Sequence, residues 1–238
     1  MTEKEFILEV NKLNILINDE KLSKLKILYE ELIKYNFHTN LTRITSLEDV
    51  YLKHYYDSLT ICKAIDLNKV NNLIDVGTGA GFPGIVLKIF FPDLSVTLLD
   101  SNQKKVEWLK FICDKLGLNV HIIKNRIENY AEENLNSFDI VTSRAVANLR
   151  VLSELSLPLV KLNGFFIPLK GSIEKELEDS KNTIELMGGE IIDIVNFDLP
   201  DNKGKRSVLK ITKKRNTYIK EIRTYDKIVK KPLKKQNI

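Results

Sequence analysis

The spacing of apolar residues predicts helices over the first 65 residues. Leucines recur at intervals of three or four positions between Leu22 and Leu32, which places them on one face of a helix. Thr2 and Glu5 stand in a capping-box pattern ahead of an apolar run, so another helix is predicted to start there. We therefore expect a helical N-terminal extension.

A polar stretch, Asn36–Thr45, separates the second predicted helix from a third. Its composition predicts a loop. Ser46, with Asp49 three residues later, predicts the start of the third helix, which carries His54.

From residue 72 onward, short apolar runs alternate with helical patterns. Seven runs have the length and composition of strands: Asn72–Val76, Ser95–Leu99, Val120–Ile123, Phe138–Thr142, Phe165–Leu169, Glu190–Phe197 and Ser207–Thr212. Between the first six strands, helices are predicted at Pro83–Phe91, Gln103–Leu116, Leu149–Lys161 and Ile173–Met187, with a turn or helix at Arg126–Glu133. This alternation predicts a doubly wound α/β sheet. The last two strands follow each other closely, so we expect a mostly parallel seven-stranded sheet that ends in an antiparallel hairpin.

The fifth predicted strand contains Pro168. Proline donates no hydrogen bond to a neighbouring strand, so this strand is expected to end, bulge or lie near an opening there. Lys170 follows within two residues.

Charge is distributed unevenly along the chain. Residues 205–238 hold 13 basic and 2 acidic side chains, a net charge of +11, whereas residues 1–204 hold 24 basic and 30 acidic ones, a net charge of −6. Clustered cations release counterions from nucleic acid, so we interpret this tail as a polyanion-binding segment. The alternative is a solvated tail that maintains solubility.

Cysteine content and hydropathy exclude other classes of protein. Cys62 and Cys113 are the only cysteines and form no Cys-x-x-Cys pair, so neither a disulfide nor a metal site is expected. The apolar runs are too short to span a membrane, and the acidic start of the chain is unlike a secretory signal. We expect a cytoplasmic monomer.

Three alternate glycines follow the first predicted strand and precede a helix: Gly77, Gly79 and Gly81. Glycines there allow a tight turn and let a ligand approach the backbone. Together with Gly84, the last two also satisfy the dinucleotide fingerprint, so a nicotinamide or flavin enzyme stays open.

Two carboxylates flank this glycine loop in the predicted sheet. Asp75 stands two residues before the first glycine, where a negative charge suits a cationic methionine group better than a pyrophosphate, because an anion needs positive potential. Asp100 closes the second strand, where a carboxylate accepts hydrogen bonds from ribose hydroxyls of either cofactor. Asp75 therefore favours a sulfonium cofactor.

An ordered set of short segments extends the pattern well beyond the loop. The segments are Asn40-Leu41-Thr42, His54-x-x-Asp57-Ser58, Asp75–Gly84, Leu98-Leu99-Asp100-Ser101, Asn125-Arg126-Ile127-Glu128, Thr142-Ser143-Arg144-Ala145 and Leu169-Lys170-Gly171. Together they resemble the bacterial 16S ribosomal RNA guanine-N7 methyltransferase family, RsmG, formerly GidB. The resemblance covers roughly Asn40 to Thr212.

The resemblance implies a Rossmann-like class I methyltransferase fold and a defined reaction. S-adenosyl-L-methionine would donate a methyl group to N7 of guanine 527 in 16S rRNA, within the small subunit or its assembly intermediate, and leave S-adenosyl-L-homocysteine. We expect an N-terminal helical extension on the substrate side at 1–65, the S-adenosylmethionine-binding domain at 66–213 and the basic tail at 214–238. The family's Thr-Pro-Lys-Lys-Tyr-Pro-Arg type of tail is replaced here by Asn216–Lys220, Asn-Thr-Tyr-Ile-Lys.

Residue roles follow from the glycine-loop pattern and from the resemblance together. The cofactor-binding positions are Asp75, Gly77, Gly79, Phe82, Asp100, Ser101, Ile127, Glu128 and Arg144. The RNA-facing positions are Lys104, Arg126, Lys170, His54 and Asp57. Arg144 and Asn40 are expected to position the reacting groups.

The proposed acceptor requires no general base, because guanine N7 carries a lone pair and no proton. His54 as a base and His54 as a packed structural residue both stay open. Two other functions also stay open: a class I methyltransferase with another substrate, and a non-catalytic RNA-binding assembly factor.

Overall fold

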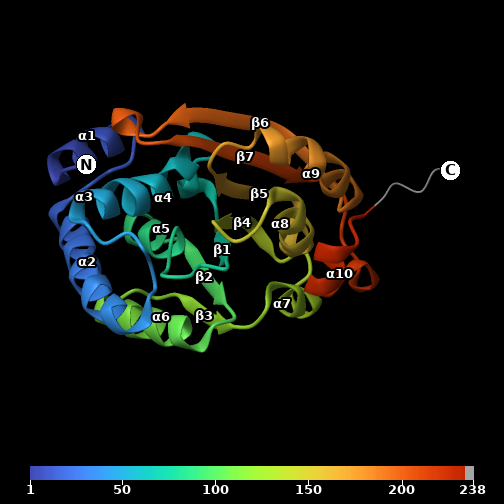
Figure 1. Ribbon diagram of the computed structural model, residues 1–238, viewed down its shortest axis with the longest axis horizontal. Helices are drawn as coiled ribbons and strands as arrows, with labels where there is room; N and C mark the ends of the chain where they lie inside the picture. Colours follow the sequence, from blue (N-terminus) through green and yellow to red (C-terminus); the bar gives the residue numbers. More distant parts are fainter. Residues whose placement is uncertain (234–238) are drawn as a thin grey trace.

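The computed structural model describes residues 1–233, and Lys234 and Lys235 of the predicted tail lie outside the described residues. Seven strands form one sheet in the order β3-β2-β1-β4-β5-β7-β6 (Figure 1). The strands are β1 (Asn72–Val76), β2 (Ser95–Asp100), β3 (His121–Lys124), β4 (Phe138–Arg144), β5 (Val160–Lys170), β6 (Gly189–Asp198) and β7 (Lys205–Lys213). β1 to β5 pair in parallel, whereas β7 pairs antiparallel with both β5 and β6. The predicted mixed sheet and its terminal hairpin are confirmed.

Helices cover both faces of this sheet (Figure 1). The α-helices are α1 (Glu3–Lys12), α2 (Asp19–Thr39), α3 (Leu47–Val50), α4 (Asp57–Leu59), α5 (Gly84–Phe90), α6 (Gln103–Lys115), α7 (Ile127–Glu133), α8 (Leu149–Ser156), α9 (Glu174–Leu186) and α10 (Tyr225–Lys230). Tyr51–Tyr56 is π-helical, and short 3-10 turns occupy Thr60–Lys63, Leu67–Lys69, Leu157–Leu159, Pro200–Asn202 and Ile219–Glu221. Helices α1 to α6 lie on one side of the sheet and α7 to α9 on the other.

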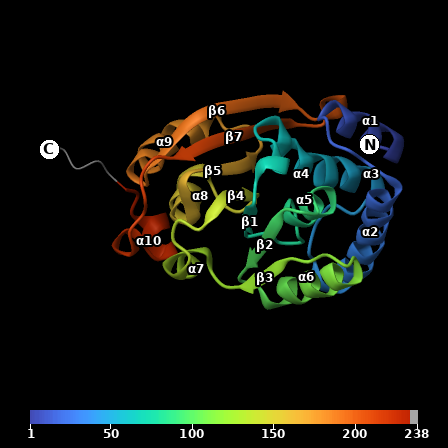
Figure 2. The ribbon, with the colours of Figure 1, turned by 180° about the vertical axis from the view of Figure 1, so that it is seen from behind.

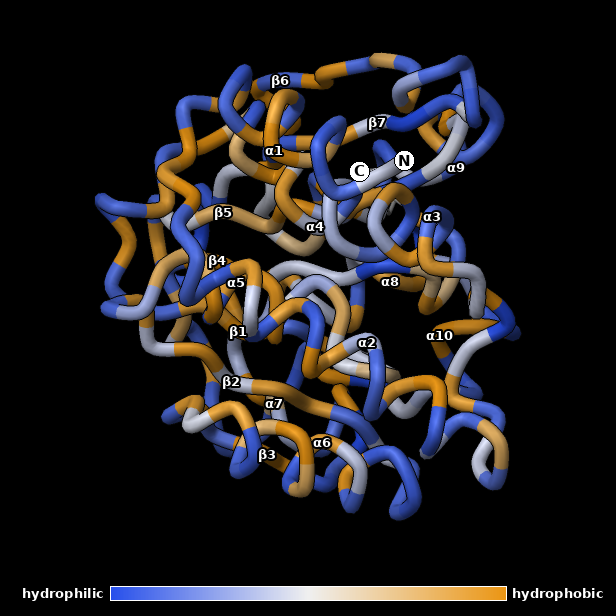
Figure 3. The backbone as a smooth tube through the Cα atoms, turned by 90° about the vertical axis from the view of Figure 1, so that its left-hand side faces the viewer, coloured by the Kyte–Doolittle hydropathy of each residue, from blue (hydrophilic) through white to orange (hydrophobic). Residues whose placement is uncertain are grey.

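Alternation along the central strands builds two cores. In β1, Leu73 joins the core beneath the N-terminal helices, whereas Ile74 and Val76 join the core beneath α8 and α9. Successive side chains of a strand point to opposite faces, so an apolar run such as this one is buried on both. Figure 3 shows the central strands as largely hydrophobic and the outer turns as hydrophilic. No helix within residues 1–233 is long and apolar enough to cross a membrane.

The N-terminal helices form as their sequence predicts and share the core of the sheet. The capping box of α1 is present, with the Thr2 amide donating to Glu5 over 2.7 Å. Leu25, Leu28 and Leu32 of α2 are fully buried in the same cluster as Leu73. These helices therefore fix the position of the π-helical segment relative to β1 and β4.

Three predicted boundaries are wrong by four or five residues, and one of them is the start of the fifth strand, which begins at Val160 and not at Phe165. The loop begins later than the predicted Asn36, because α2 continues to Thr39. Asn40 caps this helix in the left-handed conformation. The helix predicted over Leu149–Lys161 is too long, because Pro158 interrupts it and β5 begins at Val160.

Pro168 lies inside β5, two residues before its end at Lys170. This agrees with the expected position of a proline near the end of a strand.

The C-terminal arm (residues 214–233) folds back onto the domain, and Figures 1 and 2 show α10 beside α7 and α8 from both sides. Ile228 is buried against Val151 and Leu155 of α8. Arg223 forms a bidentate ion pair with the buried Glu154, with one N···O distance of 2.7 Å. The described part of the arm is thus a docked element with its own packing.

One cation counted in the basic region is buried just before the arm. Lys213 Nζ donates to the carbonyls of Leu157 and Met187 and to Thr217 Oγ1 of the arm. Burial lowers the pKa of Lys213 to about 7. This lysine serves the fold and is inaccessible to a polyanion.

Candidate active site

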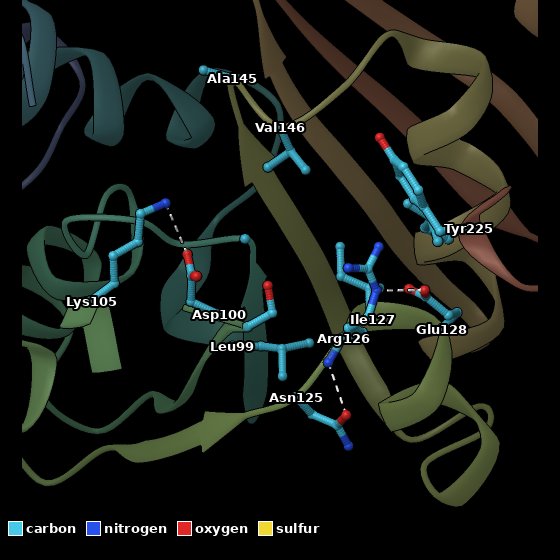
Figure 4. Close-up of a pocket in the computed structure, with 13 residues that line it drawn as sticks. Leu99, Asp100, Lys105, Asn125, Arg126, Ile127, Glu128, Ala145, Val146 and Tyr225 are labelled. Carbon is cyan, nitrogen blue, oxygen red and sulfur yellow. Dashed lines mark hydrogen bonds and ion pairs between the residues drawn. The ribbon is translucent and has the colours of Figure 1, made fainter. Parts of the chain in front are cut away.

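A first cavity of about 300 Å³ opens at the carboxyl ends of β1, β2 and β4 (Figure 4). Its lining residues are Gly77, Leu99, Asp100, Ser101, Lys105, Asn125, Arg126, Ile127, Glu128, Ala145, Val146, Leu155 and Tyr225. Ligands of open α/β sheets bind at this edge, and the volume is at the lower end of the range for small-ligand pockets.

Asp100 and the glycine loop form one wall of the first cavity. One carboxylate oxygen of Asp100 accepts the amide of Gly79 at 3.0 Å and lies 3.5 Å from Lys105 Nζ. The other oxygen accepts the amide of Asn102 at 2.9 Å. A carboxylate has about four acceptor sites, so Asp100 retains capacity for ribose hydroxyls.

Gly77 packs closely against Val146 in the same cavity wall. Its φ of +66° is in the left-handed region, and an added Cβ would lie 2.7 Å from a methyl group of Val146. Only glycine fits this position without displacing Val146. The residues present therefore fit a nucleoside-containing cofactor of the kind that the sequence predicts.

Asp75 stabilises the glycine loop through hydrogen bonds and does not line the first cavity. It is fully buried, and one of its oxygens accepts Thr78 Oγ1 at 2.6 Å and the Gly84 amide at 2.8 Å. The second oxygen has no hydrogen-bond partner within the described residues. Burial raises the pKa of Asp75 to about 7. Its observed contacts hold the shape of the glycine loop.

The far wall of the first cavity combines apolar and charged side chains. Ile127 and Glu128 come from the first turn of α7, and the Arg126 Nε lies 2.8 Å from the Glu128 carboxylate. Tyr225 of α10 completes this wall, with the Arg126 guanidinium 5.1 Å from its ring centroid. An apolar and aromatic wall beside an amide and a carboxylate suits a purine base.

A second cavity of about 490 Å³ lies beside the first. Its lining residues are Ile44, Lys53, His54, Asp57, Arg144, Ala145, Leu169, Lys170, Gly171, Ser172, Glu176 and Arg206. Ala145 lines both cavities and adopts a φ of +55°, which is uncommon for a residue with a Cβ. Backbone strain of this kind clusters at functional sites.

Arg144 connects the sheet to the N-terminal helices in the wall of the second cavity. Its Nη1 donates to the carbonyl of Lys53 at 2.6 Å and to Asp57 at 3.2 Å, and its Nη2 lies 2.8 Å from His54 Nδ1. The other oxygen of Asp57 accepts Arg206 Nε at 2.8 Å. Two cations therefore share one buried carboxylate.

His54 is held on every side within the π-helical segment. Its ring stacks on Phe82 with centroids 4.4 Å apart, and its Nε2 lies 3.0 Å from Thr42 Oγ1. Burial, with a further contribution from the charge of Arg144, lowers the pKa of His54 to about 3. This histidine is neutral at physiological pH.

The predicted site residues divide between the two cavities. Gly77, Asp100, Ser101, Ile127, Glu128 and Arg126 line the first cavity, and His54, Asp57, Arg144 and Lys170 line the second. Five predicted positions line neither: Asp75, Gly79, Phe82, Asn40 and Lys104. Of these, Phe82 packs on His54 and Gly79 donates to Asp100.

The two lysines predicted to face RNA, Lys170 and Lys104, lie in different surroundings. The ammonium of Lys170 is engaged inside the protein, 2.9 Å from the Ala147 carbonyl and 2.7 Å from Glu176. Lys105, which was not predicted, points into the first cavity, whereas the neighbouring Lys104 is exposed on α6.

Sequence reasoning missed other lining residues as well. Lys53 and Arg206 in the second cavity, and Val146 and Tyr225 in the first, carry no recognisable motif. The one available signal is adjacency, because Lys53 precedes His54 and Val146 follows the Arg144-Ala145 pair.

The sheet order, the glycine loop and the cavity at the strand ends define a class I methyltransferase. The fold is similar to that of a SAM-dependent methyltransferase from Aquifex aeolicus, with a TM-score of 0.53 and 19% identity over 73% of this chain and 97% of that one. It is also similar to the M. jannaschii protein TYW2 determined in complex with AdoMet, with a TM-score of 0.53 and 17% identity over 62% and 71% of the two chains.

Within this class, the chain belongs to the rRNA small subunit methyltransferase G family, GidB, whose model matches residues 21–208. It is 44% identical over 221 residues to ribosomal RNA small subunit methyltransferase G of Oceanobacillus iheyensis, covering 91% of this chain and 93% of that protein. The Bacillus subtilis relative of the same name is 42% identical over 91% and 92% of the two chains. The family resemblance drawn from the ordered motifs is thereby confirmed.

Proposed function

We propose that this protein transfers the methyl group of S-adenosyl-L-methionine to N7 of guanine 527 in 16S rRNA, within the small subunit or its assembly intermediate. The observation that carries the proposal is Ala145, which lines both cavities. Methyl transfer needs donor and acceptor to meet at one shared boundary. Membership of the rRNA methyltransferase family supports RNA as the acceptor.

The first cavity holds the cofactor in this proposal. The Asp100 carboxylate accepts hydrogen bonds from the ribose hydroxyls. Ile127 and Glu128 line the purine end of the cavity, the part that holds the adenine, because they combine the apolar and polar groups that a nucleoside needs. S-adenosyl-L-methionine, when bound, supplies an electrophilic methyl group. Gly77 allows this ligand to approach the backbone.

The second cavity receives the target guanine. Its cations Lys53 and Arg206, which pair with Asp49 and Asp57, have further donors that suit the phosphate and the O6 acceptor of a guanine nucleotide. RNA-modifying proteins take unpaired or extruded bases, so the guanine must leave its stack to enter. Arg144 lines the same cavity, and its hydrogen bonds to Lys53 and Asp57 join the end of β4 to the N-terminal helices.

The state of His54 in the second cavity agrees with N7 chemistry. Both nitrogens of His54 are engaged, and its pKa of about 3 makes it a weak base. Guanine N7 offers a lone pair and needs no deprotonation. In-line positioning then supplies catalysis, on the order of 7–11 kcal/mol for well-oriented intramolecular reactions.

The test uses the full chain with S-adenosyl-L-methionine labelled in its methyl group. Small subunits from a strain that lacks guanine-N7 methylation of 16S rRNA serve as substrate, with methylated subunits as the matched control. Label is expected in one guanine of the unmethylated subunits, mapped by strand cleavage at N7-methylguanine. The proposal fails if no label enters, or if label enters another base or another position.

A non-catalytic assembly factor is the competing function. It predicts cofactor and subunit binding without turnover, whereas the proposed enzyme releases one S-adenosyl-L-homocysteine for each methyl group transferred. Measuring both products in the same reaction separates the two functions.

A further inference from the structure

The C-terminal arm contributes a side chain to the first cavity. Tyr225, the first residue of α10, lies more than 120 residues after Asp100 in sequence but lines the same cavity. Figure 4 shows its ring across the cavity from Asp100 and Lys105, above Arg126 and Glu128. If the basic tail only bound RNA, its function would not explain an aromatic ring in the first cavity.

Arg126 contacts the ring of Tyr225 and is itself paired with Glu128. The Arg126 guanidinium lies 5.1 Å from the Tyr225 ring centroid, within the range of a cation–π contact. Its Nε lies 2.8 Å from Glu128 Oε1, and Glu128 is itself buried. Carboxylate, guanidinium and phenol therefore form one continuous wall.

The backbone on both sides of Tyr225 is anchored to α8. Before it, Arg223 pairs with the buried Glu154. After it, Ile228 is 1% exposed, and its carbonyl accepts Arg150 Nη1 at 3.0 Å. The backbone of Tyr225 is thus attached to α8 two residues before it, at Arg223, and three residues after it, at Ile228.

We propose that Tyr225 is a cofactor-binding residue that contacts the adenosine portion of S-adenosyl-L-methionine, with Arg126 as a positioning residue for its ring. This inference rests on the proposed function, which puts the cofactor in the first cavity. The purine end of that cavity offers Ile127 as an apolar wall and Tyr225 as the aromatic one. An aromatic ring holds a purine by stacking or edge contact at little conformational cost.

The proposal changes the role of the arm. Its docked residues complete the cofactor pocket, so the arm is part of the methyltransferase domain in function as well as in packing. Arg126, expected from the resemblance to face RNA, acts here on the cofactor side through Tyr225 and Glu128.

The experiment measures dissociation constants by titration calorimetry for S-adenosyl-L-homocysteine and for adenosine alone. The full chain is compared with Tyr225→Ala, Tyr225→Phe and, as matched control, Tyr218→Ala. Tyr218 lies in the same arm, is more exposed than Tyr225 and is absent from the cavity lining. Tyr225→Ala should weaken both ligands about tenfold, as expected for loss of an aromatic contact and its buried area, whereas Tyr225→Phe and Tyr218→Ala should stay within about twofold of wild type.

Positioning by Arg126 is tested with Arg126→Leu, which removes the cation and keeps an aliphatic side chain beside the ring. Adenosine affinity should fall by about threefold in this variant, and the double variant Arg126→Leu/Tyr225→Ala should bind adenosine no more weakly than Tyr225→Ala alone. An additive loss in the double variant would show that Arg126 acts independently of the ring.

Outcomes for the inference and for the proposed function are distinguishable. If wild type binds both ligands and Tyr225→Ala binds them equally well, Tyr225 is not a binding residue, and the proposed function stands. If wild type binds neither ligand, the proposed function fails. Thermal unfolding without ligand checks that Tyr225→Ala is folded, and the retained affinity of Tyr225→Phe supports a contact by the ring.

Discussion

Arg144 Nη2 lies 2.8 Å from His54 Nδ1, and this contact fixes the protonation of the histidine. A guanidinium donates hydrogen bonds and accepts none, so Nδ1 must be the unprotonated nitrogen. Nε2 then carries the proton and donates to Thr42 Oγ1 at 3.0 Å. His54 is a neutral link between the N-terminal helices and β4.

This arrangement predicts acid lability that depends on His54. Its pKa is about 3 in the folded chain against an ordinary value of 6.5, so below pH 6.5 the unfolded chain binds a proton that the folded chain does not. The contribution of His54 to stability is complete above pH 6.5 and is lost on acidification toward pH 3, at about 1.4 kcal/mol per pH unit. Urea unfolding of wild type and His54→Asn from pH 8 to pH 4 measures it.

The stability difference between wild type and His54→Asn should shrink as the pH falls through this window. Asparagine retains an acceptor for Arg144 but does not titrate, which makes it the matched replacement. A stability difference that is constant with pH would contradict the neutral, buried state of His54.

Asp57 leads to a second prediction, because it is shared by Arg144 and Arg206. Asp57→Ala would leave the Arg144 guanidinium buried without its carboxylate and should cost about 3–5 kcal/mol of unfolding free energy. Arg206→Ala leaves the Arg144–Asp57 pair intact, so it should cost less, roughly 1–3 kcal/mol. Denaturant titration of the two variants at pH 7.5 checks the order, and a reversed order would contradict the shared-carboxylate arrangement.

The third prediction concerns Arg144→Lys. A lysine ammonium cannot reproduce the planar fork that reaches Lys53, His54 and Asp57 at once. Misplacement of this cavity wall by about 1 Å should reduce methyl transfer roughly 100-fold. Because Arg144 does not line the first cavity, affinity for S-adenosyl-L-homocysteine should stay unchanged.

Measured affinity decides between two roles for this arginine. A parallel loss of S-adenosyl-L-homocysteine binding in Arg144→Lys would return Arg144 to the cofactor-binding role implied by the family resemblance. Circular dichroism and thermal unfolding give the fraction of folded variant, which corrects the methyl-transfer rate for any loss of stability.

The sheet was predictable because its signals are local. Most strands contain a short apolar run bounded by polar or glycine residues, and Asp75 and Asp100 stand next to or at strand ends that their own segments define. The end of α8 was missed because its apolar pattern runs on past Pro158 into β5. Because the apolar residues keep a helical spacing past Pro158, the sequence pattern did not indicate the change from helix to strand.

The site was only partly predictable because several side chains reach it through tertiary packing. Arg206 meets Asp57 across 149 residues, and Tyr225 enters the first cavity only because Ile228 and Arg223 dock on α8. No local pattern encodes such contacts. Lys105 was missed for a simpler reason: one position along α6 turns the side chain by about 100°, which separates it from the exposed Lys104.

The fourth prediction compares two glycines with the same backbone strain and different surroundings. Gly77 and Gly117 have φ values of +66° and +62°, but an added Cβ meets Val146 at 2.7 Å in the first and nothing within 4 Å in the second. Gly117→Ala should therefore cost about 1 kcal/mol from the left-handed conformation alone. Gly77→Ala adds a steric clash within the first cavity, so it should cost more and should also weaken S-adenosyl-L-homocysteine binding.

Titration calorimetry and urea unfolding of both variants separate strain from the clash. The Gly117→Ala variant should bind S-adenosyl-L-homocysteine as wild type does, since it lies outside both cavities. A Gly77→Ala variant with wild-type affinity would mean that Val146 moves aside without disturbing the cofactor. In that case the close approach of Gly77 and Val146 would serve the packing of the loop and not the shape of the pocket.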